Sequence, residues 1–118
     1  MYILYQVVNM SKCIKSQLPL LKSLCKCSPK DRHSLLRHAD NHLVKSICEC
    51  CVNTLSGRVK LNALQKKKLR RYKKTLRLLS QRKISLKSKK KQIVQTGGSF
   101  LLALLPAAIS TILSLLKK

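Results

Sequence analysis

Residues 40–57 read DNHLVKSICECCVNTLSG and contain the clearest helical pattern of the chain. Asp40 is a favourable N-cap residue, and Gly57 is a typical C-terminal stop. Between them, apolar residues recur at spacings of three and four, at Leu43, Val44, Ile47, Cys48, Cys51, Val52 and Leu55. The segment therefore predicts an amphipathic helix with one apolar stripe.

The residues before this segment also have helical spacing. Apolar side chains stand at Ile14, Leu18, Leu21 and Leu24, and Ser28-Pro29 is a helix start for a short helix over residues 29–38. We expect residues 14–57 to form a small helical domain. Residues 1–13 would be an N-terminal extension, within which Met10 is an alternative start to Met1.

Downstream, a basic segment carries a second apolar stripe. Asn62 and Gln65 have the spacing of a capping box. The stripe continues at Leu69, Tyr72, Leu76 and Leu79, through a run that is otherwise almost entirely Lys and Arg. We expect a long basic amphipathic helix here, which shares a small core with Leu35, Leu36 and the helix after Asp40.

Ser85 is the expected cap of a further basic helix, and the Gly97-Gly98 pair marks its end. The basic helical region is therefore assigned to residues 58–96. No useful length of the chain alternates with a period of two, so no strand is predicted. The expected fold class is all-α, with a small helical N-terminal domain, the basic helical region and a hydrophobic tail at residues 99–118.

The charge balance restricts the partners of this 118-residue chain. It has 26 Lys and Arg against three Asp and Glu, and a formal net charge of +23. Residues 50–118 contain no acid, and residues 58–91 alone hold 16 cations. Such a charge favours a polyanionic partner, either nucleic acid or an anionic membrane. With no Trp and one Phe, stacking on unpaired bases is poorly supported, so duplex DNA bound through its phosphates is the preferred partner.

The predicted phosphate-binding side chains come from the basic region. They are Lys66, Lys67, Lys68, Arg70, Arg71, Lys73, Lys74, Arg77, Arg82, Lys83, Lys87, Lys89, Lys90 and Lys91. The alternatives are a solvated basic face or a nuclear-localisation signal, for which KKKLRRYKK is suitable. A solvated face normally mixes both signs of charge, and this one does not.

Ser99 to Leu116 is an uncharged run of 18 residues, roughly 27 Å long as a helix and close to the hydrocarbon thickness of a bilayer. The expected membrane or partner contacts are Phe100, Leu101, Leu102, Leu104, Leu105, Ile109, Ile112, Leu113, Leu115 and Leu116. Burial in the chain's own core or in an assembly is the alternative; because the rest of the chain is small and basic, we expect membrane contact. A stripe of small residues from Ser99 to Ser114 also predicts self-association.

Enzymatic and metal chemistry are not indicated. Three acids leave little for acid–base catalysis, and no oxyanion hole or phosphate-binding glycine loop is recognisable, so no catalytic residue is assigned. The cysteines and histidines between Cys25 and Cys51 lack the paired spacing of structural zinc sites, so we predict no metal or cofactor. The first residues do not read as a secretory signal, and reduced thiols are expected.

Three stretches together resemble a known family. RHADNHLVKSICECCVNTLSG, LQKKKLRRYKKTLRLLSQRKISLKSKKK and QTGGSFLLALLPAAISTIL are similar to the small basic proteins of adintovirus-like and Maverick (Polinton) elements, over roughly residues 15–116. These proteins are similar in turn to the adenovirus core protein X. The resemblance implies a virion component that binds and condenses packaged DNA, located in the virion and the host nucleus, with a membrane-active or capsid-binding tail.

The resemblance also implies proteolytic processing at Gly97-Gly98. Adenovirus-type proteases cut after Gly-Gly preceded by a hydrophobic residue, and here Gln95 stands at the hydrophobic position, with Val94 one place away. The competing hypothesis is a cationic protein that is anchored in or disrupts an intracellular membrane and has no role with nucleic acid.

Overall fold

A computed structural model describes residues 16–116, except for the side chains of Ile112, Leu115 and Leu116. After a first helix at residues 16–26, the elements are α2 (Pro29–Arg37), α3 (Asn41–Leu55), α4 (Ala63–Arg70), α5 (Lys73–Ser80), α6 (Leu86–Gln95) and α7 (Leu101–Leu116). Residues 16–116 contain no strand, so the all-α prediction is confirmed for this part of the chain. The predicted extension at residues 1–13 lies outside the described residues.

Side-chain caps begin four of the helices at the positions that the sequence indicated. These caps are Ser28, Asp40, Asn62 and Ser85. The capping box is complete at α4, because Asn62 Oδ1 accepts the Gln65 N–H at 2.8 Å and Gln65 Oε1 accepts the Asn62 N–H at 3.0 Å. Each cap satisfies a backbone donor that has no partner within its helix.

The prediction of one continuous basic helix through Leu69, Tyr72 and Leu79 is wrong, whereas the separate helix predicted after Ser85 is present as α6. The structure divides the basic region into α4, α5 and α6, with a first break at Arg71-Tyr72 that the sequence did not predict. The tertiary contacts explain this break, because α4 packs against α7 whereas α5 packs against α3. With the break, Leu69 of α4 and Leu79 of α5 are both buried although the two helices pack against different neighbours.

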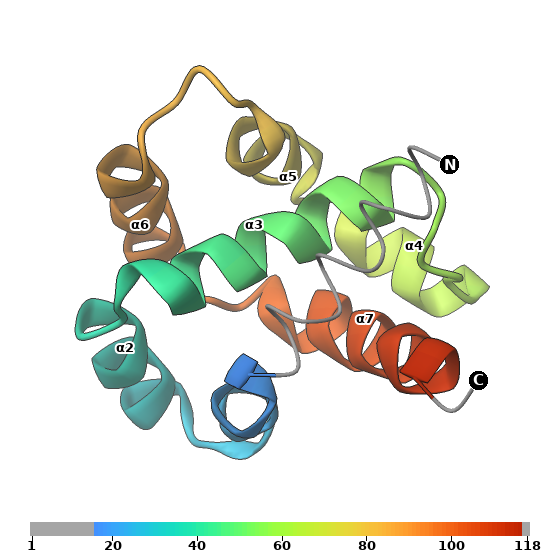
Figure 1. The fold of residues 1–118 in the computed structure, drawn as a ribbon, viewed down its shortest axis with the longest axis horizontal. Helices are drawn as coiled ribbons and strands as arrows, with labels where there is room; N and C mark the ends of the chain where they lie inside the picture. The colour runs from blue at the N-terminus through green and yellow to red at the C-terminus, as the bar shows by residue number, and fades with distance from the viewer. Residues whose placement is uncertain (1–15, 117–118) are drawn as a thin grey trace.

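Helix α3 lies at the centre of the fold, in contact with α5, α6 and α7 (Figure 1). More of α3 is buried than the predicted apolar stripe, because Ser46, Cys50, Asn53 and Thr54 are buried as well. Ser46, Asn53 and Thr54 donate to carbonyls one turn earlier in the same helix, so burial leaves these donors satisfied. The last two residues of the predicted stripe, Val52 and Leu55, are exposed.

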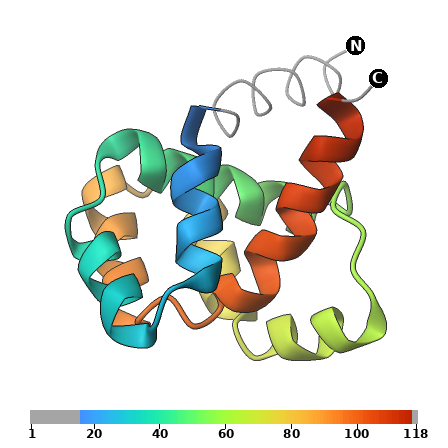
Figure 2. The same cartoon turned by 90° about the horizontal axis from the view of Figure 1, so that it is seen from below.

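The tail helix α7 supplies much of the core, and the expectation that the protein is too small to enclose it is wrong. Figures 1 and 2 show α7 between the first helix and α4. The following tail residues are buried: Phe100, Leu101, Ala103, Leu104, Leu105, Ala107, Ala108 and Ile109. The physical reason is that α3 is buried on several sides, so that it offers α7 a face beyond the single stripe seen in the sequence.

This burial also changes which tail residues are available for the contacts that the sequence predicted. Phe100, Leu101, Leu104, Leu105 and Ile109 do not reach a membrane or partner in this fold, whereas Leu102 is exposed and Leu113 is half-buried. The side chains of Ile112, Leu115 and Leu116 lie outside the described set. The small-residue stripe is divided as well, since two of its members, Ala103 and Ala107, are in the core.

The Gly97-Gly98 pair forms the turn between α6 and α7. Both residues have a positive φ, of 70° and 75°, which favours glycine strongly. At Gly98 the neighbours also come close, because a Cβ there would lie 2.5 Å from Leu36 Cδ1 and 3.1 Å from Arg32 Cδ. Gly98 is buried, so a protease could cut after it only where this turn opens locally.

Candidate polyanion-binding surface

The cations of the basic region lie mostly on the molecular surface. Among the predicted phosphate-binding residues the exposed ones are Lys66, Lys67, Lys68, Arg70, Arg71, Lys73, Lys74, Arg77, Arg82, Lys83, Lys87 and Lys91. They come from α4, α5, α6 and the loop that joins α5 to α6. The helices expose these cations because each has an apolar side packed into the core.

Helix α5 separates the two kinds of side chain most sharply. Leu76 and Leu79 are buried against the core, while Lys73, Lys74 and Arg77 are exposed. Residues at spacings of three and four share one face of a helix, so these three cations form a single basic face. Lys87 and Lys91, four residues apart, do the same on α6.

Two predicted phosphate ligands are not exposed in the structure. Lys89 is only 8% exposed and lies near the Cys48 thiol, whose pKa is lowered by this cation but raised more by burial. Lys90 Nζ donates to the Ala39 carbonyl at 2.7 Å, just beyond the C-terminal end of α2. Sequence position alone could not distinguish these lysines from the exposed ones beside them. We therefore remove both from the candidate surface.

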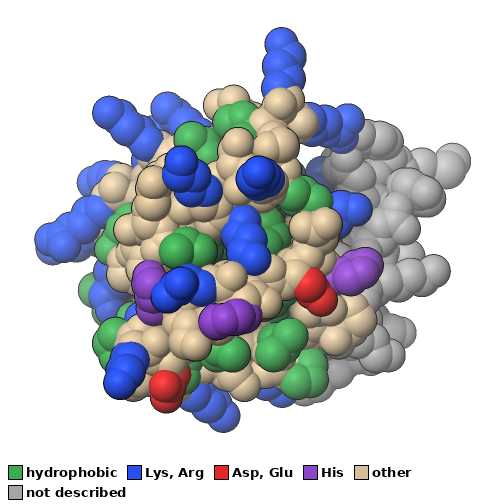
Figure 3. Space-filling view, turned by 90° about the vertical axis from the view of Figure 1, so that its left-hand side faces the viewer, with side chains coloured by type: hydrophobic (Ala, Val, Ile, Leu, Met, Phe, Trp, Pro, Cys, Tyr) green, Lys and Arg blue, Asp and Glu red, His purple; other side chains and the backbone are tan. Residues whose placement is uncertain are grey.

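The three acids belong to elements other than the basic helices. Asp31, Asp40 and Glu49 belong to α2, the α3 cap and α3, and no acid follows in the sequence. Figure 3 shows one side of the molecule, on which acidic and His side chains lie in the lower half, while Lys and Arg side chains continue to the upper and left edges. On this side Lys and Arg side chains are spread over both halves, whereas the acids are confined to the lower half.

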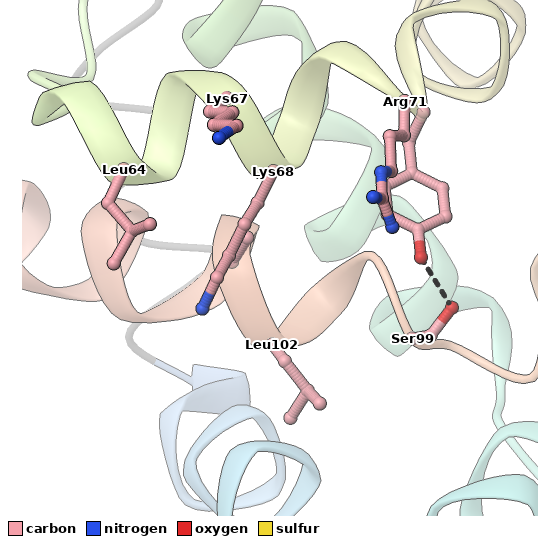
Figure 4. A pocket seen from close by; sticks show the side chains of 8 residues that line it. Leu64, Lys67, Lys68, Arg71, Ser99 and Leu102 are labelled. Carbon is pink, nitrogen blue, oxygen red and sulfur yellow. Dashed lines mark hydrogen bonds between the residues drawn. The ribbon is translucent and has the colours of Figure 1, made fainter.

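A pocket of about 490 Å³ lies between α4 and the start of α7 (Figure 4). It is lined by Leu64, Lys67, Lys68, Arg71, Tyr72, Ser99, Leu102 and Ala103. The Tyr72 hydroxyl and Ser99 Oγ are hydrogen-bonded at 3.1 Å beside it, and the Tyr72 ring lies 6.0 Å from that of Phe100. The sequence analysis missed this pocket because its walls are 27 or more residues apart in the chain.

Burial suppresses the ionisation of three cysteine thiols. Burial raises the pKa of Cys48 to about 11, and it also raises the pKa values of Cys25 and Cys51. A protonated thiol is a poor nucleophile and a poor metal ligand. Within residues 16–116, no three His, Cys, Asp or Glu side chains are grouped closely enough to hold a metal ion.

Fold and surface together define a small all-helical protein with a predominantly basic exterior. No protein-family model, curated protein or solved structure matches the chain. In the part of the chain that the structure describes, no helix has both the length and the apolar character needed to cross a membrane.

Proposed function

We propose that the protein binds duplex DNA without sequence preference, through the exposed cations of α4, α5, α6 and the loop between α5 and α6. The observation that carries the proposal is the exposure of twelve of the fourteen predicted cations on a chain segment without acids. Cations of this kind bind phosphates and release condensed counterions, which favours association and makes it sensitive to salt.

The size of the effect follows from the geometry of the surface. The twelve cations are spread over three helices and a loop, so we take about half of them, or roughly six, to face one duplex at a time. Six phosphate contacts correspond to a slope of about −5 in log K against log salt. Affinity should therefore fall about a thousandfold between 50 and 200 mM salt.

The resemblance to proteins of Maverick-type elements would make the bound duplex a packaged viral-type genome. A protein with a net charge of +23 would neutralise the phosphates of this genome and so favour condensation of the DNA. The basic segment and the apolar tail would then have separate roles, since the cations bind DNA and most of the tail holds together the fold that displays them.

The test is the binding of the full chain to two 30-base-pair duplexes of unrelated sequence over a range of salt concentrations. In one triple variant, K73Q/K74Q/R77Q, the basic face of α5 is neutralised. The matched control K22Q/K26Q/K30Q removes the same number of exposed cations from the first helix and α2. We expect the α5 variant to reduce the salt slope by two to three and the control to leave it nearly unchanged.

Anionic liposomes are the competitor that tests the membrane hypothesis. Equal affinity for both duplexes, with retention of DNA in the presence of liposomes, supports the proposal. Weak DNA binding together with strong liposome capture, or equal losses in the two triple variants, contradicts it.

A further inference from the structure

The pocket between α4 and α7 has a composition that phosphate binding does not explain. Leu64 and Leu102 are 60% and 47% exposed, and both line it. The buried Ala103 and the half-buried Tyr72 ring add further apolar surface. DNA phosphates would gain nothing from the two leucines, whereas an apolar partner surface would remove them from water.

The charged side chains that line the pocket are all cationic. Lys67, Lys68 and Arg71 line it from α4 and its C-terminal end, and all three are exposed. In Figure 4, Leu64 and Lys68 project from the same helix toward α7, so an apolar and a charged side chain face the same space. A ligand that fills the pocket must therefore have apolar groups together with negative charges.

We infer that this pocket is a docking groove for an acidic amphipathic helix of a partner protein. Such a helix has apolar side chains three, four and seven residues apart, and these would pack between Leu64 and Leu102. Its Asp and Glu side chains would lie against Lys67, Lys68 and Arg71. The two walls of the groove are themselves helices, and a third helix packs against such ridges in the ordinary way.

Charge complementarity favours an acidic partner helix over a second copy of this chain and over its own residues 1–15. A second copy has a net charge of +23 and would place its cations near those that line the pocket. Residues 1–15 contain Lys12 and Lys15 but no acid, so they offer the pocket cations no counter-charge. An acidic helix from another protein supplies both the charge and the apolar face.

The groove shares three cations with the proposed DNA surface. An acidic helix bound to Lys67, Lys68 and Arg71 would therefore compete with DNA for α4, while the basic face of α5 would remain accessible. Helix docking does not depend on DNA binding, because the apolar contacts at Leu64 and Leu102 contribute to docking and not to DNA binding.

The probe is a fluorescein-labelled synthetic 20-residue peptide with Leu on one helical face and Glu at most other positions. A second peptide has the same composition, but its leucines are distributed around the helix. Fluorescence anisotropy with the full chain at 150 mM salt should show at least tenfold tighter binding of the amphipathic peptide. Equal binding of the two peptides would overturn the inference, because charge alone would then explain the interaction.

The variant L64S/L102S tests the apolar contacts. We expect each exposed leucine to account for a five- to tenfold change in affinity, so the double variant should lose the preference between the peptides. The matched control L20S/L55S changes two leucines of similar exposure outside the pocket and should keep it. L64S alone, at the more exposed position, provides the test if the double variant loses helicity.

DNA binding by the same variants separates this inference from the proposed function. L64S/L102S should bind duplex DNA as the unmodified chain does, even if the phosphate surface proves to lie elsewhere. The inference is rejected if L64S/L102S keeps the peptide preference, or if its affinity for DNA falls as much as its affinity for the peptide.

Discussion

Replacement of one buried leucine in α7 would test whether the apolar tail belongs to the core. Leu104 is 0% exposed, whereas Leu102, two residues earlier in the same helix, is 47% exposed. The two positions have the same chemistry and the same secondary structure. A comparison of Leu104→Ala with Leu102→Ala therefore isolates the contribution of burial.

The expected difference is large. Truncation of a fully buried leucine to alanine removes its transfer free energy and leaves a cavity, which costs about 2–5 kcal/mol. At Leu102 part of the side chain is already in water and alanine favours the helix, so we expect a loss of less than about 1 kcal/mol. For a domain of this size, a loss of 3 kcal/mol corresponds to a decrease of roughly 10 °C in Tm.

Urea and thermal unfolding in aqueous buffer, followed by circular dichroism at 222 nm, measure both variants against the unmodified chain. Equal and small effects of Leu104→Ala and Leu102→Ala would refute the burial of α7 in the core. That result is what a tail outside the folded core would produce, and it would restore the membrane-contact prediction for Leu101, Leu104 and Leu105.

Two further predictions concern the turn before α7 and the buried thiols. Gly98→Ala should destabilise the fold by about 2–4 kcal/mol, from the positive φ and the clash with Leu36, whereas Gly97→Ala, with open space around its Cβ, should cost only about 1 kcal/mol. Urea titrations of the two variants measure the difference, and equal losses would contradict the close approach at Gly98. Burial raises the pKa of Cys48 from 9.0 to about 11 in the folded chain. As pH rises, the unfolded chain therefore releases the thiol proton before the folded chain does. The contribution of this thiol to the unfolding free energy is complete below pH 9 and is lost between pH 9 and 11. Cys48→Ala should therefore show a shallower decline in unfolding free energy over that range, and parallel pH profiles of the two proteins would rule out this contribution.

The local starts and ends of the helices could be predicted from the sequence because their causes are local. The cap at Asp40 involves only a side chain and a backbone N–H three residues away. The Asn62–Gln65 box is equally short-range, and the positive φ of Gly57 reflects the freedom of glycine itself. These signals do not depend on which helices later become neighbours.

The candidate surface was predictable only in part. Most of the cations from Lys66 to Lys91 are exposed, because an ionised side chain avoids burial unless it has a partner. Lys89 and Lys90 are the exceptions, since their surroundings come from α3 and from the end of α2. No sequence pattern near residue 90 indicates which lysine meets the Ala39 carbonyl, because that contact spans 51 residues.

The all-α class, the strongly basic exterior and the positions of most caps and stops could be read from local sequence patterns. The tertiary structure decided the break at Arg71-Tyr72, the burial of α7 and the formation of a groove between Leu64 and Leu102. The physical reason is the range of the interactions. Capping and charge act within a few residues, whereas the fate of an apolar helix depends on whether distant segments offer it a complementary face, as α3 and α4 do for α7.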